Sequence, residues 1–581
     1  MKFQYRDTIQ NIWVFTCILL FFSLATHSVL AQESKTEKYL ETIVEAEAKT
    51  SAKEWKEASL LWEKVVETNP VQGRFWNRLA TAYYNAKDYR KAISAYEKSI
   101  ELGDGNPASA AYNIACNYAL LGEKENALKW LEKSLEMGFL DLENARKDKD
   151  LKTLHGNPKF NELVGIFDTG KMSRTEGLRT DLRFLAREIK RRRYGSFDRN
   201  SLQEFDTQVE ALYKEIPKLS DSQIDVRLMK LLVKVGDGHS AFYGDIFSNE
   251  HAATLPVKFY LFEEGLFIIA ADPKYKNLLG SQVLEIGGHS IEELLQKIEP
   301  IISRDNYYWI RQVAPYFMRD LWLLNGLDLI PDTKKVSLDI RSLKGEKKTV
   351  ELESEAKNAF IWNTLPSPPE WINFFQTLEK PVPLYLKKMA TKYWFEYLPE
   401  SKTLYFQYNL IRDDEQESFA KFCERLFEFI NENDVKKLVI DMRWNNGGNT
   451  GLLPPLIHGL IKNEKINKRG NLFVITGRRT FSAAQNAATF IERETNAIFI
   501  GEPTGASPNF VGEEEPFQLP FSKSFVNVSN LYWQSSSPTD SRTWIAPLIY
   551  VPPTFAAYRE NRDIAMEAII NFDNVKIKDI Q

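Results

Sequence analysis

The chain has 581 residues, enough for several domains, and 43% of them are hydrophobic and 27% charged. That composition is ordinary for a soluble globular protein. The formal net charge is −4, so no strongly basic field suggests nucleic acid as a partner.

Residues 1–31 have the pattern of a secretory signal, with Lys2 and Arg6 ahead of an apolar run over residues 12–24. Modest side chains precede Gln32, where cleavage is expected. An uncleaved membrane anchor is the alternative, but the apolar run is short against the roughly 20 residues that a span needs. We therefore expect a signal peptide, a secreted or periplasmic protein of the bacterial cell envelope, and membrane contact only through an uncleaved signal.

Two cysteines, Cys116 and Cys423, remain after the signal, about 300 residues apart. An oxidising compartment permits a disulfide, but cysteines this distant are more typical of small buried hydrophobic residues. No Cys/His spacing indicates zinc, and no cofactor is expected.

Residues 32–165 contain an internal repeat of about 34 residues, in which small and large side chains alternate so that antiparallel helices can pack closely. This pattern resembles tetratricopeptide repeats, and three units would stack into a short α-helical solenoid with a concave face. A plain helical bundle is the alternative. A protein partner or peptide is the usual ligand of such a face. The repeating positions are Trp76, Leu79, Ala80, Tyr83, Ala92, Tyr96 and Ser99, then Ala111, Ile114, Ala115, Tyr118, Ala127, Leu131 and Ser134.

Two segments of different character follow. Residues 175–250 show apolar spacings of three and four, which predict a helical subdomain. Residues 255–353 contain four strand-like runs and a helix over residues 290–301. Their order resembles a degenerate PDZ-like module, which would bind a peptide at a sheet edge; a purely structural insertion is the alternative.

Strands and helices alternate over residues 385–575, which predicts an α/β layer with parallel strands. In this region Ser482 follows the apolar run over residues 472–475 and opens a helical run. A serine at a strand-to-helix turn is well placed for a nucleophile, because the helix N-terminus favours developing negative charge. Alternatively, Ser482 and Gln485 form an S-x-x-Q capping box, which needs no catalysis.

Three further segments qualify the interpretation of Ser482. They are Gly236-Asp-Gly-His239-Ser, the glycine loop Asp441-Met-Arg-Trp-Asn-Asn-Gly447-Gly448 after a buried strand, and Gly501-Glu-Pro-Thr-Gly after the strand that follows the Ser482 helix. Each has a structural explanation alone: a lone histidine usually makes one hydrogen bond, and Asn-Gly is a turn signal.

Together, in this order, the four segments resemble the C-terminal-processing (tail-specific) and tricorn-type serine protease family, over about residues 178–581. The resemblance implies an α+β protease with a helical subdomain, a PDZ-like module and an α/β crotonase-like catalytic core, following the repeat solenoid. It also implies that Ser482 is the acyl-forming nucleophile.

The resemblance also suggests how the nucleophile is activated. Tail-specific enzymes use a lysine in the loop after the nucleophile helix, but residues 501–509 contain none. The tricorn-type branch uses a histidine of the D-G-H segment, so His239 is expected to be the general base and acid. Gln485, where the lysine-dependent branch often has glutamate, points the same way.

The remaining roles also come from the resemblance. Backbone N–H groups of Gly447 or Gly448, and of Ala483, are expected to form the oxyanion hole. Asp540 is expected to be the acid of the triad, with Glu502 and Glu515 as rivals. Asp441 and Arg443 are interpreted as structural residues that order the glycine loop.

The function predicted from the sequence is therefore a serine-type peptidase that hydrolyses peptides or unstructured protein tails. The alternative is a catalytically silent scaffold that holds peptides on the repeats and the PDZ-like module. A lipid or carbohydrate hydrolase is disfavoured, because no G-x-S-x-G elbow occurs.

Overall fold

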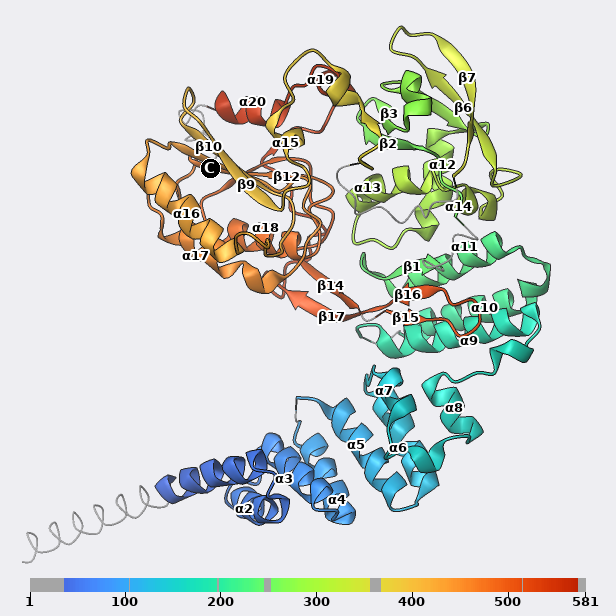
Figure 1. The fold of residues 1–581 in the computed structure, drawn as a ribbon, viewed down its shortest axis with the longest axis vertical. Coiled ribbons are helices and arrows are strands. Elements are labelled where there is room, and N and C mark those ends of the chain that lie inside the picture. Colours follow the sequence, from blue (N-terminus) through green and yellow to red (C-terminus); the bar gives the residue numbers. More distant parts are fainter. Residues whose placement is uncertain are drawn as a thin grey trace, which may run out of the picture. The chain divides into compact units, whose positions relative to one another are not determined.

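The computed structural model describes residues 36–103, 105–195, 198–244, 252–355, 367–514 and 516–572. They form two compact units, one up to Asp168 and one from Thr169 onward, called unit 1 and unit 2 here (Figure 1). The predicted signal peptide lies outside the described residues. Within those ranges, no helix is both long and apolar enough to cross a bilayer.

Unit 1 is a series of antiparallel helix pairs, as the repeat predicts. After a helical stretch at residues 36–51 come α2 (Trp55–Thr68), α3 (Gly73–Asn85), α4 (Tyr89–Glu101), α5 (Pro107–Leu120), α6 (Lys124–Glu136), α7 (Leu142–Lys147) and α8 (Pro158–Val164). Ala80, Ala92 and Ala127 are fully buried where helices cross, because a methyl side chain lets two backbones approach closely. Large rings such as Trp62 fill the space between crossings.

Unit 2 begins with a helical part made of α9 (Arg174–Arg192), α10 (Arg199–Glu215) and α11 (Asp221–Leu232). It is completed by strands from the far end of the chain: β1 (Ala241–Gly244) pairs with β16 (Phe525–Asn527), which pairs with β15 (Phe517–Gln518). The buried carboxylate of Asp181 accepts the backbone N–H groups of Phe521 and Ser522, each at 2.7 Å. The helical part therefore depends on contacts more than 300 residues along the chain.

A second, mainly antiparallel sheet follows, with its central strands in the order β2-β3-β4-β6-β7. The strands expected from the sequence are present, and the expected helix ends at Ile298 and continues as a short 3-10 turn. Two helices over residues 307–326 were not expected. The elements are β2 (Val257–Phe262), β3 (Gly265–Ala271), β4 (Gln282–Ile286), β5 (His289–Ser290), α12 (Ile291–Ile298), α13 (Tyr307–Phe317), α14 (Leu321–Gly326), β6 (Lys335–Arg341), β7 (Lys347–Glu353) and β8 (Ile372–Asn373).

The rest of unit 2 is built on a six-stranded sheet in the order β18-β13-β12-β11-β10-β9, parallel except for β9. This is the α/β layer that the alternating pattern predicts. Its strands are β9 (Tyr393–Leu398), β10 (Thr403–Tyr408), β11 (Lys437–Asp441), β12 (Leu472–Thr476), β13 (Ile498–Gly501) and β18 (Ile549–Tyr550). Its helices are α15 (Leu384–Lys387), α16 (Phe419–Glu432), α17 (Pro454–Lys462), α18 (Ala483–Glu494), α19 (Phe555–Tyr558) and α20 (Ile564–Ile570).

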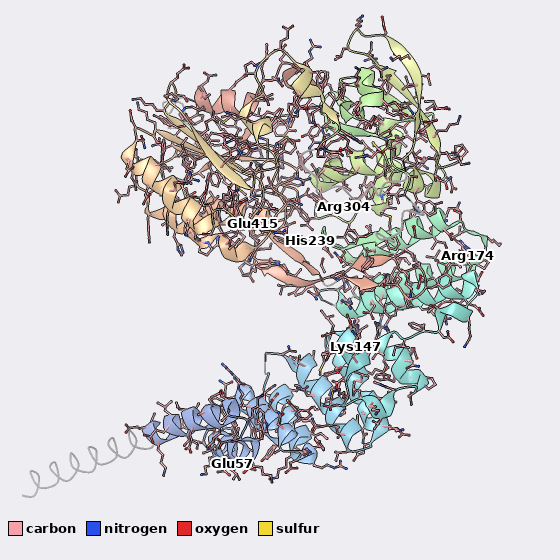
Figure 2. All side chains as sticks on the ribbon, in the orientation of Figure 1. Glu57, Lys147, Arg174, His239, Arg304 and Glu415 are labelled. Atoms are coloured by element: carbon pink, nitrogen blue, oxygen red, sulfur yellow. The ribbon has the colours of Figure 1, made fainter. Side chains whose placement is uncertain are left out.

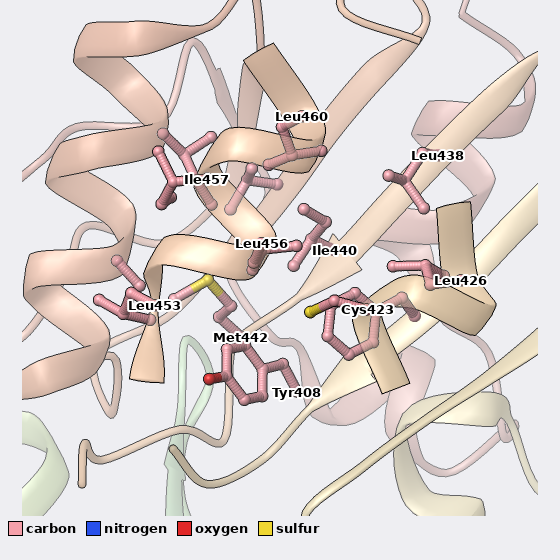
Figure 3. Close-up of a cluster of buried hydrophobic side chains, with 14 of the residues drawn as sticks. Tyr408, Cys423, Leu426, Leu438, Ile440, Met442, Leu453, Leu456, Ile457 and Leu460 are labelled. Carbon is pink, nitrogen blue, oxygen red and sulfur yellow. The ribbon is translucent and has the colours of Figure 1, made fainter. Parts of the chain in front are cut away.

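Both faces of this sheet are covered. Along β11, Leu438 and Ile440 point into the core under α16, α17 and α18 (Figure 3). Val439 points to the opposite face, where Met566 of α20 packs. The alternation follows from the two-residue period of a strand, and burial on both faces explains why the strands are almost wholly apolar. Cys423 lies in the first core as a buried free thiol, and Cys116 is buried in unit 1, as the sequence predicts.

The last element is a two-stranded ribbon of β14 (Asn509–Glu514) and β17 (Ser529–Gln534). In Figure 1 it runs between the six-stranded sheet and the β1-β16-β15 sheet. It thereby connects the strand ends that carry Ser482 with the segment that carries His239.

Candidate active site

Ser482 lies between β12 and α18, in a backbone conformation that serine rarely adopts. Its φ is 54° and its ψ is −130°. A non-glycine residue held there costs on the order of 1–3 kcal/mol, and such strain clusters at functional sites. The side chain makes no capping hydrogen bond, and the Gln485 amide instead donates to Thr489 at 3.4 Å. The capping-box alternative is therefore wrong.

The glycine loop after β11 lies directly against Ser482. A Cβ atom on Gly447 would stand 2.7 Å from the Cβ of Ser482 and 3.0 Å from the Ala483 nitrogen. A Cβ on Gly448 would stand 2.0 Å from the carbonyl oxygen of Ile411. Both glycines have positive φ, 118° and 135°. The two glycines are required here by sterics as well as by backbone conformation.

The backbone N–H groups beside Ser482 differ in whether they already donate a hydrogen bond. The Gly447 N–H donates to the Asn445 side chain at 3.0 Å. Around Gly448 the chain forms a parallel bridge with Ile411, which uses the carbonyl of Gly447 and the N–H of Asn449. The Gly448 N–H therefore points away from Ile411. Within the described residues, neither it nor the Ala483 N–H has a hydrogen-bond acceptor. Gly448 and Ala483, rather than Gly447, hold the open donors.

Upstream, Asp441 and Arg443 tie the start of the glycine loop to the core. Buried Asp441 accepts from the Tyr405 hydroxyl at 2.7 Å and from Arg443 Nε at 3.0 Å. The Arg443 guanidinium also contacts Asp563, the N-cap of α20, at 2.9 Å. These contacts match the structural role expected for the two residues.

His239 is held next to the Ser482 turn by aromatic stacking. Its ring stacks on Phe481, the residue before Ser482, with centroids 4.4 Å apart, and on Phe510 of β14 at 5.2 Å. Nε2 faces Gly512, where a Cβ would be only 3.4 Å away. In Figure 2 His239 lies among crowded side chains inside unit 2. Folding therefore brings the imidazole beside the turn across about 240 residues.

The two ring nitrogens of His239 are buried and have no hydrogen-bond partner in the described part of the chain. The ring approaches the Val511 backbone without meeting hydrogen-bond geometry. Burial lowers the pKa of His239 from 6.5 to about 4, and only the nearby Val511 backbone acts in the other direction. The imidazole is therefore neutral at pH 7, and it is not bonded to Ser482 in this arrangement.

The acid expected for the triad is not at His239. Asp540 instead binds the Arg542 guanidinium at 2.8 Å and the Ser536 hydroxyl at 2.7 Å, and Arg542 holds the pKa of that carboxyl well below its usual range. In this arrangement Asp540 is therefore not bonded to His239, because its local ion pair occupies the carboxylate, and its role as the triad acid stays a prediction. Glu502 pairs with Arg478, and Glu515 lies outside the described residues.

Two carboxylates that were not predicted hold the backbone of the histidine segment. Asp237 accepts the N–H groups of His239 and Ser240 at 2.8 and 2.6 Å. Asp305 accepts the Gly238 N–H at 2.8 Å and the Ser507 N–H at 3.3 Å. Asp237 lies in the D-G-H segment itself, so its spacing could have indicated this role. Asp305 has no local sequence signal.

Comparisons with known proteins agree with the two-part architecture. Residues 71–138 match the tetratricopeptide repeat family model. A 59-residue stretch is 39% identical to a chloroplastic protein of Arabidopsis thaliana; it covers 10% of this chain and 18% of that protein. The chain thus spans less than a fifth of this curated relative.

Solved structures resemble a larger part of the chain. A serine-to-alanine mutant of CPAF is 11% identical, covers 69% of this chain and 99% of its own, and gives a TM-score of 0.50. The photosystem II D1 C-terminal processing protease gives 0.32 at 12% identity, over 65% of this chain and 93% of its own. The tricorn protease gives 0.35 at 14%, over 69% and 37%. At these identities the CPAF match shows a shared fold: a helical repeat region is followed here by a mixed α/β, CPAF-like domain.

Replacing Asp305 with Asn should change how stability depends on pH. Burial and the neighbouring Asp237 charge raise the pKa of Asp305 to about 7, whereas an unfolded aspartate titrates near ~4. Between these values the folded state binds more protons, so its stability falls as pH rises, by up to about 1.4 kcal/mol per pH unit. Asp305→Asn stays neutral and should lose this slope, although its amide accepts only one of the two N–H bonds.

The measurement is urea unfolding at pH 5, 6, 7 and 8, with exposed Asp332→Asn as the control. At pH 5 the Asp305→Asn variant should have a lower free energy of unfolding than the parent protein. This difference should shrink at each higher pH. Parallel curves for the variant and its parent would show that Asp305 does not titrate in this window.

Proposed function

We propose that the chain is a serine peptidase in which Ser482 attacks the peptide carbonyl and forms an acyl-enzyme. The observation that carries this is the strained, uncapped serine at a strand-to-helix turn, packed against two glycines. Strain of this kind raises a hydroxyl out of the fold and persists only where the surroundings enforce it. A capping serine would have relaxed φ and ψ and a bonded side chain.

The open N–H groups of Gly448 and Ala483 would bind the oxyanion of the tetrahedral intermediate. Their proximity to Ser482 and the absence of a Cβ on Gly448 support this assignment. The first turn of α18 adds a favourable field for negative charge. Losing one such donor costs about 3 kcal/mol of barrier in serine peptidases.

His239 would take the proton of Ser482 as general base and return it to the leaving amine. In its favour are its place beside Phe481 and its neutral state at pH 7. Reaching the hydroxyl requires the ring to move from its position against Gly512. Catalytic hydrogen bonds are often long in empty sites and shorten when substrate binds.

The proposal also covers the two sheets of unit 2, the substrate, the repeats of unit 1 and the export of the protein. The β2–β8 sheet with α12 would be a PDZ-like module, the six-stranded sheet a crotonase-like core, and peptides or unfolded protein tails the substrate. The repeats of unit 1 would recruit a protein partner, since helical repeats offer a concave surface for this. Export to the periplasm or beyond rests on the pattern of residues 1–31, and N-terminal sequencing of the mature protein beginning at Gln32 would support it.

A catalytically silent peptide-binding scaffold is the second candidate, and one observation favours it. Among the described residues, which leave out Glu515, His239 has no carboxylate at either nitrogen and no bond to Ser482, so they form no complete proton relay in this arrangement. Tight peptide capture without turnover over long incubation would support the scaffold over the peptidase.

Replacing Ser482 with Ala should abolish covalent labelling by a fluorophosphonate probe, because the probe needs an activated hydroxyl. Circular dichroism should be unchanged, since an alanine removes only one oxygen. Ser537→Ala, at an exposed serine, is the matched control and should label like the parent protein. Labelling that survives in Ser482→Ala would contradict the assignment.

Replacing His239 with Ala should reduce peptide hydrolysis by about 10²–10⁴-fold, the usual contribution of a general base. Lys523→Ala should leave the rate unchanged, because among the described residues that exposed ammonium bonds the Pro520 carbonyl alone. The parent rate should hold from pH 7 down to about 5 and fall as the imidazole protonates near its pKa of about 4. A greater loss in Lys523→Ala than in His239→Ala would identify a lysine base instead.

A further inference from the structure

Unit 2 contains a cavity that is separate from the residues assigned to peptide hydrolysis. Its volume is about 100 Å³, and it lies between β2, α13 and the loops that follow β11 and β12. Neither Ser482 nor His239 lines it. The loop over residues 476–479, which leads to Ser482, forms one wall. A space of this size holds more than one water molecule, which needs roughly 10–15 Å³.

Lys258 of β2 lines the cavity and is buried, with 8% of its surface exposed. Its ammonium makes no hydrogen bond or ion pair with any residue of the described ranges. The charged groups that act on it are the guanidinium groups of Arg479 and Arg319. Together with burial, they lower its pKa to about 7. A buried polar group without a hydrogen-bond partner is costly whether it is charged or neutral, and a ligand that accepts from Lys258 would remove this cost.

The carboxylates at the cavity do not compensate Lys258, because other cations hold them. Asp563 pairs with Arg443 at 2.9 Å, and Glu502 pairs with Arg478 at 3.3 Å. The second terminal nitrogen of Arg478, Nη2, is buried and has no acceptor. Among the described residues, the cavity therefore presents two nitrogen donors without acceptors, Lys258 Nζ and Arg478 Nη2, together with Glu502 Oε1, which also lacks a hydrogen-bond partner.

The other walls are apolar and aromatic. Tyr260, Tyr385, Trp444 and Tyr558 all line the cavity, and Arg478 lies over the Tyr260 ring at 4.7 Å. Such a surface binds an apolar or aromatic body through area removed from water. A site with an apolar wall and a few placed polar groups has the composition of a small-molecule pocket.

We propose that this cavity binds a small carboxylate with an apolar or aromatic body, whose oxygens accept hydrogen bonds from Lys258 and Arg478. Charge-assisted bonds of this kind are about twice as strong as neutral ones. The carboxylate could be supplied by a free organic acid or by the C-terminal residue of a peptide. Its binding would brace the loop that leads to Ser482.

The first test is isothermal titration calorimetry of the full chain at pH 8 with 3-phenylpropionate and with 3-phenylpropionamide. The acid should bind at least about tenfold more tightly than the amide, since only the acid pairs with the cations. Repeating the titration in buffers of different ionisation enthalpy should show uptake of about one proton, because the bound carboxylate protonates Lys258. Equal affinities, or no binding of the acid, would overturn the assignment.

Lys258→Met supplies the second test, with exposed Lys344→Met as its matched control. The Lys258→Met protein should lose most of the preference for acid over amide, with only Arg478 left to pair with the carboxylate, whereas Lys344→Met should keep the full preference. Without ligand, Lys258→Met should melt at a higher temperature than the parent, because it removes a buried amine that has no hydrogen-bond partner among the described residues. A lower melting temperature with unchanged acid binding would show that Lys258 is a structural residue.

A third arm separates the two sources of the carboxylate. Short peptides ending in Phe, with a free or an amidated C-terminus, are titrated into Ser482→Ala protein to prevent turnover. Binding of the free-acid peptide that is lost in the Ser482→Ala/Lys258→Met double variant assigns the site to peptide ends. Binding of 3-phenylpropionate alone assigns it to free organic acids, and binding of neither ligand refutes the site.

Discussion

The close approach of the glycine loop to the Ser482 turn is the constraint on which the rest of the site depends. Gly448 leaves no room for a side chain against the Ile411 carbonyl, and Gly447 leaves little against Ser482 itself. Because these contacts are backbone to backbone, they cannot relax by rotating a side chain. The turn is thereby fixed in a strained conformation, and two N–H groups remain without acceptors beside the serine hydroxyl.

A rigid sheet holds the strained Ser482 turn in its conformation. The strands that end at Asp441 and Thr476 are buried on both faces, and paired cores hold them in register. Asp441, Arg443 and Asp563 then anchor the loop to the far layer through charge-assisted bonds. Such buried pairs are costly to break once formed, so the loop is held in position independently of any ligand.

Much of this could be predicted from the sequence, because the signals are local. The apolar strands at residues 437–441 and 472–476, the repeat with buried Ala80 and Ala92, and the glycine loop are all visible as patterns. The helices over residues 307–326 and the roles of Asp305 and Asp181 were not, since their partners lie far away in the chain. Asp540 was predicted as the triad acid from the family resemblance, and in the structure its carboxylate pairs with Arg542, two residues later.

The pairing of β1 with β16 has a consequence for the making of the protein. His239 lies two residues before β1, and β16, the strand that pairs with β1, is about 285 residues further along the chain. A ribosome delivers the chain from the N-terminus at roughly 5–20 residues per second, so β16 emerges tens of seconds after the segment that carries the histidine. The serine, the glycines and the repeats are all present earlier. In a nascent chain the segment that carries the histidine therefore stays without its neighbouring strand until residue 527 has been released.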